Sequence, residues 1–209
     1  MIELYTWNTS NGQRASIMLE ESGLPYRPHF VDITKGEQQK ENFLAINPMG
    51  KIPAIVDRAS ADGQPLVLFE TTAILLYLAE KTGRFMPSNP RARADVYAWL
   101  AFSASDLTPA FTGQFYFTIL APEKIPYAID LYTNEISRFL KVMETRLGAM
   151  PYLAGDDYSL ADIHAYPSAA TSAKRLKDGL APYPNIEAWV KRIGARPAVQ
   201  RGMAIYRAG

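Results

Sequence analysis

The chain has 209 residues, of which 48% are apolar and 21% are charged, and its formal charge is +1 at pH 7. This composition is that of a folded globular protein, and it argues against nucleic acid as the main partner, because phosphate binding needs a concentrated basic surface. The sequence contains no cysteine. A disulfide framework, a thiolate metal site and a thiol nucleophile carried by the protein are therefore excluded.

The amino terminus has neither the basic segment nor the apolar segment of a signal peptide. The longest apolar run, residues 73–79, is too short to span a membrane. The sequence therefore predicts a cytoplasmic protein without a membrane partner.

The first part of the chain alternates short strand-like runs with amphipathic segments. Strands are predicted at 2–7, 26–33, 50–58 and 62–70, and helices at 12–22, 37–47 and 70–83. In the first of these helices, Arg14, Glu20 and Glu21 are expected on the polar face. The order β-α-β-α-β-β-α is consistent with a single α/β layer domain.

Beyond residue 84 the pattern becomes helical. After a segment interrupted by prolines, helices are predicted at 94–107, 110–117, 125–148, 159–173 and 185–196, with a bend near Pro109 and an irregular end from Pro197. We therefore expect an α/β domain over residues 1–83, a linker over 84–89 and an all-α domain over 90–209.

The segment WNTSNGQRA, residues 7–15, joins the first strand to the first helix and carries small polar side chains at Thr9, Ser10 and Asn11. A polar loop between a strand end and a helix start is a common place for binding or chemistry. This loop contains no cysteine, tyrosine or histidine, so it offers no conventional nucleophile or base.

Two further segments are candidates for ligand binding. A proline at a strand start, as in Ile52-Pro53, can be cis and leave the preceding backbone open to a peptide-like ligand, but taken alone it is better explained as an edge strand. Glu70 and Thr71 stand at a helix start, where N–H groups and the helix dipole attract a carboxylate. Taken alone, simple helix capping explains these two residues better.

Ser159 and Asp162, in the segment SLAD, form the pattern of a capping box, which is a structural role. His29 and His164 are isolated from each other and from any acidic cluster. We therefore expect no metal site.

Read together, these segments resemble the cytosolic glutathione transferases over nearly the whole chain. The similarity rests on KIPA, FET and SLAD at their separations. TSNG, NPMGKIPAIVD, FETTAILLYLAEKTG and IPYAI are similar to the nu-class bacterial proteins, in which a proline usually stands where this chain has Ser10. The resemblance implies a thioredoxin-like first domain, a helical-bundle second domain and a homodimer.

The same resemblance implies glutathione as co-substrate. The glutathione-binding residues it implies are Gln38, Lys51, Ile52, Pro53, Glu70 and Thr71. Ile52 would pair with the ligand backbone, Glu70 and Thr71 would take the γ-glutamyl end, and Lys51 would face the glycyl carboxylate. The number of glutathione molecules per subunit stays open.

The ligand thiol would then lie over Thr9, Ser10 and Asn11. A free thiol has a pKa of about 8.5, so it needs help to ionise at neutral pH. The Thr9 hydroxyl and the Asn11 amide are hydrogen-bond donors and not bases, so they would stabilise a thiolate. The activity that follows is a glutathione-dependent disulfide oxidoreductase, in which one glutathione attacks a disulfide and a second completes the exchange.

Two other functions stay open. A conjugating transferase would use Thr9 or Ser10 to assist attack on an electrophile held near Phe111, Phe115 and Tyr116, although aromatic residues at this spacing are more often core. A non-catalytic glutathione-binding regulatory protein would keep the fold without turnover.

Overall fold

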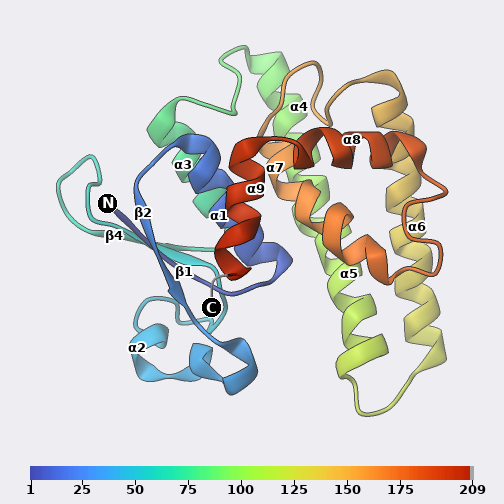
Figure 1. Ribbon diagram of the computed structural model, residues 1–209, viewed down its shortest axis with the longest axis horizontal. Helices are drawn as coiled ribbons and strands as arrows, with labels where there is room; N and C mark the ends of the chain where they lie inside the picture. Colours follow the sequence, from blue (N-terminus) through green and yellow to red (C-terminus); the bar gives the residue numbers. More distant parts are fainter. Residues whose placement is uncertain (208–209) are drawn as a thin grey trace. The chain divides into compact units, whose positions relative to one another are not determined.

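The computed structural model describes residues 1–207, leaving out the side chains of Ser172 and Arg207 (Figure 1). The chain divides into two compact units. One comprises residues 1–84 together with the C-terminal segment from Gly194, and the other comprises residues 85–193.

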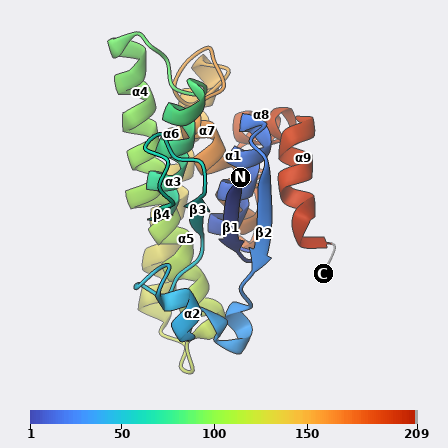
Figure 2. The same ribbon diagram turned by 90° about the vertical axis from the view of Figure 1, so that its left-hand side faces the viewer.

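The first unit is built on one four-stranded sheet. Its strands are β1 (Ile2–Thr6), β2 (Tyr26–Phe30), β3 (Ala54–Asp57) and β4 (Leu66–Phe69). They lie in the order β2-β1-β3-β4, with β1 parallel to β2 and the other pairs antiparallel. Figure 2 shows the strands side by side in this order. This mixed sheet with its packed helices is the thioredoxin-like arrangement that the resemblance implies.

Helices complete the first unit. They are α1 (Ser10–Ser22), the single-turn α2 (Glu41–Leu44), α3 (Thr71–Thr82) and α9 (Pro197–Ala204), with 3-10 turns at Ile33–Lys35, Glu37–Gln39 and Ile205–Arg207. Helix α1 packs against both α3 and α9. Phe43 of α2 forms a separate core cluster with Val31 and Ala54.

Helix α1 is enclosed more completely than its sequence pattern predicts. Arg14 has no exposed surface and Glu21 is 6% exposed, so the prediction of a polar face through these residues is wrong. A pattern of apolar residues identifies the side of a helix that meets the sheet, but it does not reveal a second helix that covers the opposite side. Here the sides of α1 are covered by α3 and α9.

The C-terminal segment is helical, whereas the sequence predicts an irregular end from Pro197. A proline is compatible with the first turn of a helix, where its missing N–H is not needed. Gly202 lets α9 (Figure 1) approach α1 closely, because a Cβ at Gly202 would lie 2.7 Å from the Ile17 Cα. Arg196 holds the same contact through Nε and Nη2, which donate to the Glu21 carboxylate at 2.6 and 2.9 Å. The expected helical range of 90–209 does not reflect this return to the first unit.

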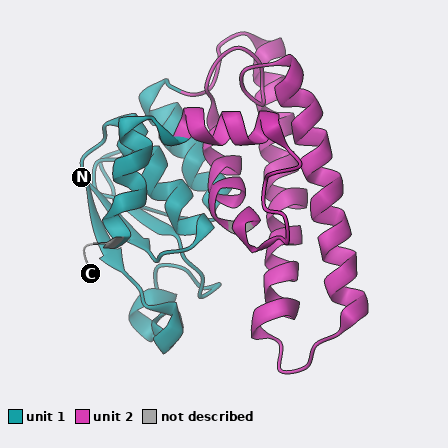
Figure 3. Ribbon diagram, turned by 45° about the vertical axis from the view of Figure 1, so that its right-hand side comes forward, with its two compact units in different colours: residues 1–84, 194–209 teal, residues 85–193 magenta. Residues whose placement is uncertain are grey.

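The second unit is helical (Figure 3). Its elements are α4 (Pro90–Ala101), α5 (Thr108–Phe115), α6 (Pro126–Ala149), α7 (Leu160–Pro167) and α8 (Pro184–Gly194), with π-helical turns at Phe102–Leu107, Tyr116–Leu120 and Ser168–Ser172 and a 3-10 turn at Ala173–Arg175. Among the described helices, none is both long and apolar enough to cross a membrane. The observed fold confirms the predicted class, an α/β thioredoxin-like part and an all-α helical part.

The start of α7 is the predicted capping box. The Asp162 carboxylate accepts from the backbone N–H and the hydroxyl of Ser159, both at 3.1 Å. It also accepts from the Leu153 N–H at 3.0 Å and from the Trp189 indole N–H at 2.9 Å. Burial raises the pKa of Asp162, and these donors oppose that rise. This helix start is therefore completed by the chain itself.

Candidate functional site

The strand register brings three distant loops to one edge of the sheet. Thr6 at the end of β1 pairs with Phe30 at the end of β2, while Ala54 at the start of β3 pairs with Tyr5 and with Phe69 at the end of β4. The loop after β1, the loop before β3 and the start of α3 after β4 therefore leave from the same edge. These loops carry Thr9, Ser10, Asn11, Lys51, Ile52, Pro53, Glu70 and Thr71.

In the loop between β1 and α1, side-chain oxygens accept hydrogen bonds from residues at the start of α1. Thr9 is the N-cap of α1, and its Oγ1 accepts from the Gly12 N–H at 3.1 Å. The Asn8 Oδ1 accepts from Gln13 Nε2 at 3.0 Å, and the Asn11 Oδ1 accepts from Arg14 Nη1. The side-chain oxygens of three loop residues are thus occupied by donors from the first turns of α1.

The donors of the same three side chains stay available. Within residues 1–207, neither the Thr9 hydroxyl hydrogen nor the side-chain NH₂ groups of Asn8 and Asn11 donate to a protein atom. The first turn of α1 contains no acidic residue, so the positive end of the helix dipole is not neutralised there. The loop therefore suits an anion.

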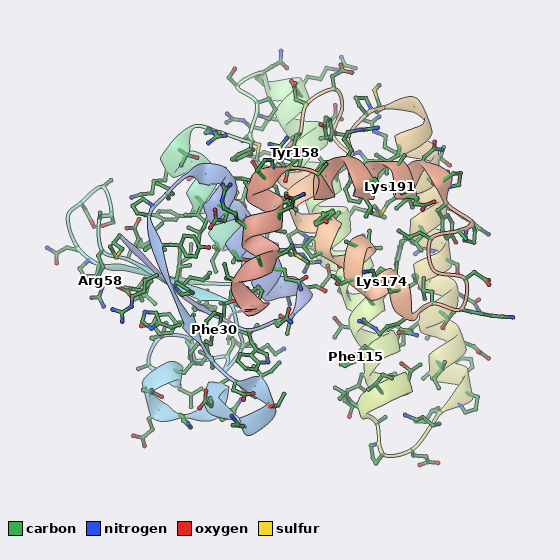
Figure 4. The ribbon with its side chains drawn as sticks, viewed as in Figure 1. Phe30, Arg58, Phe115, Tyr158, Lys174 and Lys191 are labelled. Carbon is green, nitrogen blue, oxygen red and sulfur yellow. The ribbon has the colours of Figure 1, made fainter. Side chains whose placement is uncertain are left out.

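Gly12 and Tyr206 hold this loop against the end of β1. A Cβ at Gly12 would lie 2.1 Å from the Trp7 carbonyl oxygen and 2.6 Å from the Thr6 Oγ1, so only glycine fits. The Tyr206 hydroxyl lies 2.8 Å from that same Thr6 oxygen. Phe30, labelled in Figure 4 at the end of β2, meets the Tyr206 ring edge-on at a centroid distance of 6.0 Å. The close approach fixes where α1 begins.

Glu70 does not cap α3, although capping is the explanation that its local sequence favours. Its side chain makes no cap hydrogen bond and is exposed. Its backbone has φ 70°, which is unusual for a residue other than glycine and costs roughly 1–3 kcal/mol. The following Thr71 is 8% exposed. An exposed carboxylate thus stands beside a helix start that it does not satisfy.

The Ile52–Pro53 peptide bond is cis. Ile52 packs its side chain against the cluster of Val31, Phe43 and Ala54. In the described chain, the backbone N–H and C=O of Ile52 make no hydrogen bond to another protein group. The side chain of Ile52 is therefore packed, while its backbone N–H and C=O are available for strand-like pairing with a ligand.

The loop before Ile52 is ordered by Asn47, which no pattern in the sequence marks as a site residue. Asn47 is 2% exposed. Its Nδ2 donates to the Lys51 carbonyl at 2.5 Å and its Oδ1 accepts from the Met49 N–H at 2.9 Å. Lys51 itself is exposed and forms no ion pair within the described residues. Its ammonium is therefore available to a carboxylate.

Gln38 comes from a different segment, the 3-10 turn Glu37–Gln39 between β2 and α2. Its Oε1 is buried and has no hydrogen-bond partner within the described residues. Buried amide oxygens are usually satisfied, so this amide is incomplete without a further donor.

The aromatic residues expected to hold an electrophile have different environments. Phe111 is 3% exposed and belongs to the core, whereas Tyr116 is 50% exposed. Phe115, labelled in Figure 4, receives the Arg175 guanidinium at 4.9 Å from its ring centroid. Only part of this set is therefore accessible to a ligand.

Both histidines bond to neighbouring side chains. His29 Nε2 pairs with Glu3, and His164 Nδ1 lies 2.8 Å from the Ser103 Oγ. No group of three or more potential metal ligands occurs among the residues that the structure describes.

Two family models match the chain. Residues 10–81 match the glutathione S-transferase N-terminal domain, and residues 115–197 match the glutathione S-transferase C-terminal domain. The chain therefore belongs to the glutathione S-transferase family and is a glutathione transferase-like enzyme.

Individual members of the family are similar to the chain over nearly its whole length. The chain is 44% identical to the disulfide-bond oxidoreductase YfcG of Escherichia coli (strain K12), over 100% of this chain and 96% of YfcG. A glutathione transferase from Burkholderia graminis with two glutathione molecules bound per subunit superposes with a TM-score of 0.94 at 37% identity, covering 100% of this chain and 89% of that one. A glutathione transferase from Pseudomonas putida with one glutathione disulfide bound per subunit gives 0.92 at 34% identity, covering 98% and 91%.

Proposed function

We propose that the protein is a glutathione-dependent disulfide oxidoreductase that stabilises the glutathione thiolate with Thr9 and Asn11. One observation carries this proposal. The loop that would receive the sulfur has its side-chain oxygens occupied internally and its donors left over. Donors aimed at an anion lower the pKa of a thiol, and no side chain in the loop is suited to abstract a proton.

The remaining site residues suit the other parts of glutathione. The exposed Glu70 carboxylate is available to the γ-glutamyl ammonium, and the start of α3 at Thr71 to the γ-glutamyl carboxylate. The open backbone of Ile52, with Pro53 after it, would pair with the ligand main chain. Lys51 would bind the glycyl carboxylate. By the same resemblance Gln38 would lie at the glycyl end, where its unpartnered Oε1 could accept from the glycyl amide N–H and not from the carboxylate.

The chemistry is two successive thiol–disulfide exchanges. The first glutathione thiolate attacks one sulfur of the substrate disulfide, forms a mixed disulfide and releases a substrate thiolate. A second glutathione thiolate attacks the glutathione sulfur of that mixed disulfide, forms glutathione disulfide and releases the second substrate thiolate. Two glutathiones lose two electrons, the substrate gains them, and the released thiolates take protons from water. Since the chain has no cysteine, all sulfurs in this exchange belong to ligands.

The relatives support this assignment over conjugation. A relative at 44% identity bears the name of a disulfide-bond oxidoreductase, and solved relatives hold either two glutathiones or one glutathione disulfide. Those ligands are the reduced and oxidised forms that the exchange interconverts. A conjugating transferase would instead use Thr9 or Ser10 with an electrophile near Phe115 and Tyr116.

Parallel assays with a small hydroxyalkyl disulfide and with an aryl halide separate these activities. We expect turnover of the disulfide. Turnover of the aryl halide alone would overturn the proposal in favour of conjugation, and glutathione binding without turnover of either would favour a regulatory protein.

Asn11→Ala tests the assignment of the loop. We expect disulfide turnover to fall at least roughly tenfold, which corresponds to about 1.4 kcal/mol of lost thiolate stabilisation. Thr145→Ala is the control and should leave turnover unchanged. Thr145 is an exposed threonine on α6 whose hydroxyl donates to the Lys141 carbonyl. A near wild-type rate for Asn11→Ala would contradict the assignment.

We also propose, from the resemblance, a nu-class protein that forms a homodimer. From the sequence pattern we propose a cytoplasmic location, a first domain over residues 1–83, a linker over 84–89 and a helical domain over 90–209, whose last segment packs with the first unit. Analytical ultracentrifugation at micromolar concentration tests the dimer, for which a single species of monomer mass would be the contrary result.

A further inference from the structure

Arg14 is a fully buried cation in the second turn of α1. Its side chain has no exposed surface, which is rare for arginine. Burial lowers the pKa of Arg14 to about 9, which still leaves the guanidinium protonated at neutral pH. A buried positive charge therefore contacts Asn11, in the segment that would receive the thiol.

The contact between Arg14 and Asn11 has a chemical direction. The Arg14 Nη1 donates to the Asn11 Oδ1. An asparagine side chain has an oxygen end and an NH₂ end of nearly equal shape, so rotation by half a turn exchanges an acceptor for a donor. Arginine carries donors only, so it accommodates only the oxygen end.

We propose that Arg14 is a positioning residue that fixes the polarity of Asn11, so that its NH₂ end faces the site and its oxygen cannot. This inference rests on the proposed function, in which Asn11 donates to the ligand sulfur. With the opposite orientation, the amide oxygen would face the thiolate and repel it.

The neighbouring pair of Gln13 and Asn8 shows why arginine matters at this position. Gln13 Nε2 donates to the Asn8 Oδ1 at 3.0 Å, while the Gln13 Oε1 is buried without a partner within the described residues. A glutamine carries both a donor and an acceptor, so it can bind either end of an asparagine. The chemistry of its partner therefore does not fix the orientation of Asn8, whereas it does fix that of Asn11.

Two substitutions of Arg14 separate polarity from mere hydrogen bonding. Arg14→Lys keeps a partner that only donates, whereas Arg14→Gln supplies a partner that bonds either end of Asn11. We expect Arg14→Gln to raise the pKa of the bound glutathione thiol by about one unit and to lower kcat/KM for the disulfide at neutral pH roughly tenfold. Arg14→Lys should stay within about threefold of wild type. The thiol pKa is read from the pH dependence of the thiolate ultraviolet absorbance of the glutathione complex.

A charge acting directly on the sulfur predicts a different outcome in a double-mutant cycle. If Arg14 acts through Asn11, adding Arg14→Gln to Asn11→Ala should have little further effect. We expect kcat/KM to change by less than about twofold and the thiol pKa by less than about 0.3 unit. An equal effect of Arg14→Gln in both backgrounds would overturn the proposal, as would an unchanged thiol pKa in the single variant.

The same experiment distinguishes this inference from the proposed function. If Asn11→Ala alone leaves turnover and thiol pKa at their wild-type values, the thiolate assignment itself fails, and the inference fails with it. If Asn11→Ala is impaired and Arg14→Gln is not, only the inference fails.

Arg196→Met is the control for loss of an arginine from the same unit, because Arg196 binds Glu21 at the other end of α1. It should leave the thiol pKa unchanged. Thermal melts establish that each variant is folded. If Arg14→Gln does not fold, Arg14→Lys carries the test through its predicted wild-type thiol pKa, and a rise of one unit in that variant would overturn the inference.

Discussion

The starts of α3 and α7 have similar sequences and opposite structures. Each helix begins with an acid and a hydroxyl residue ahead of an apolar run, Glu70-Thr71 in one case and Ser159 with Asp162 in the other. At α7 the acid and the hydroxyl bond to each other and to the helix backbone. At α3 the Glu70 side chain makes no cap bond, and its backbone takes a positive φ.

This difference separates a structural helix end from a binding helix end. Asp162 satisfies donors of its own chain and is buried, so its removal leaves several of them without a partner. Glu70 satisfies no donor of α3, so its carboxylate and the helix start are both available to a ligand. Substitution of Asp162 should therefore lower the stability of the protein, whereas substitution of Glu70 should weaken ligand binding.

Asp162→Ala should have the largest effect. Loss of the capping box costs about 1–2 kcal/mol, and the stranded N–H groups of Leu153 and Trp189 raise the total to roughly 3–5 kcal/mol. Urea denaturation of the full-length protein measures this loss of unfolding free energy. The milder Ser159→Ala removes only one of the donors to Asp162 and should cost about 1 kcal/mol. If Asp162→Ala lowered the unfolding free energy by less than about 1 kcal/mol, the start of α7 would not differ from that of α3 in its structural role.

Glu70→Gly should weaken glutathione binding roughly tenfold, because the charge-assisted bond to the ligand ammonium is lost. Its unfolding free energy should hold or rise by about 1 kcal/mol, because glycine adopts a positive φ without strain.

Glu70→Ala is the matched variant, because it removes the same carboxylate but keeps a Cβ at the strained position. It should show the same loss of affinity in calorimetric titrations without the gain in stability. If both variants lose stability as Asp162→Ala does, Glu70 is a structural cap after all.

Ser10→Pro should have the smallest effect. Ser10 is the first residue of α1 after its N-cap, where a proline fits without breaking the helix. Turnover should stay within about twofold and stability within about 1 kcal/mol of wild type. A tenfold loss of turnover would show that the Ser10 hydroxyl or N–H takes part in the reaction, and would extend the anion site beyond Thr9 and Asn11.

The fold is largely readable from periodicity, because strands and helices of this chain bury regular sets of apolar residues. The main exceptions concern α1, α9 and residues 37–47, where the sequence predicts one helix and the structure has a 3-10 turn, Glu37–Gln39, followed by the single-turn α2. The sequence around Pro197 looks irregular by itself, and only the contact of Gly202 with Ile17 makes it a packed helix. Such a contact joins residues far apart in the chain, so no local pattern reports it.

The sequence predicts which residue types form the site, but it does not predict the hydrogen bonds between them. Thr9, Asn11 and Glu70 are recognisable as polar residues at helix starts, but the local sequence at Glu70 favours a cap that its backbone geometry does not form. Arg14 is misread as a surface residue because a charged side chain is normally exposed. The spacing of Asn11 and Arg14, three residues apart at a helix start, is the one signal that would have joined them.

The return of α9 to α1 also bears on the order in which the protein is made. The sheet and its first helices are synthesised before the second unit, yet α9, which covers α1, is synthesised after it. The second unit is contiguous in sequence and has all its residues earlier. The second unit should therefore be able to fold before the first one is complete, and Ile17 and Arg14 should stay exposed to proteases until α9 has been synthesised.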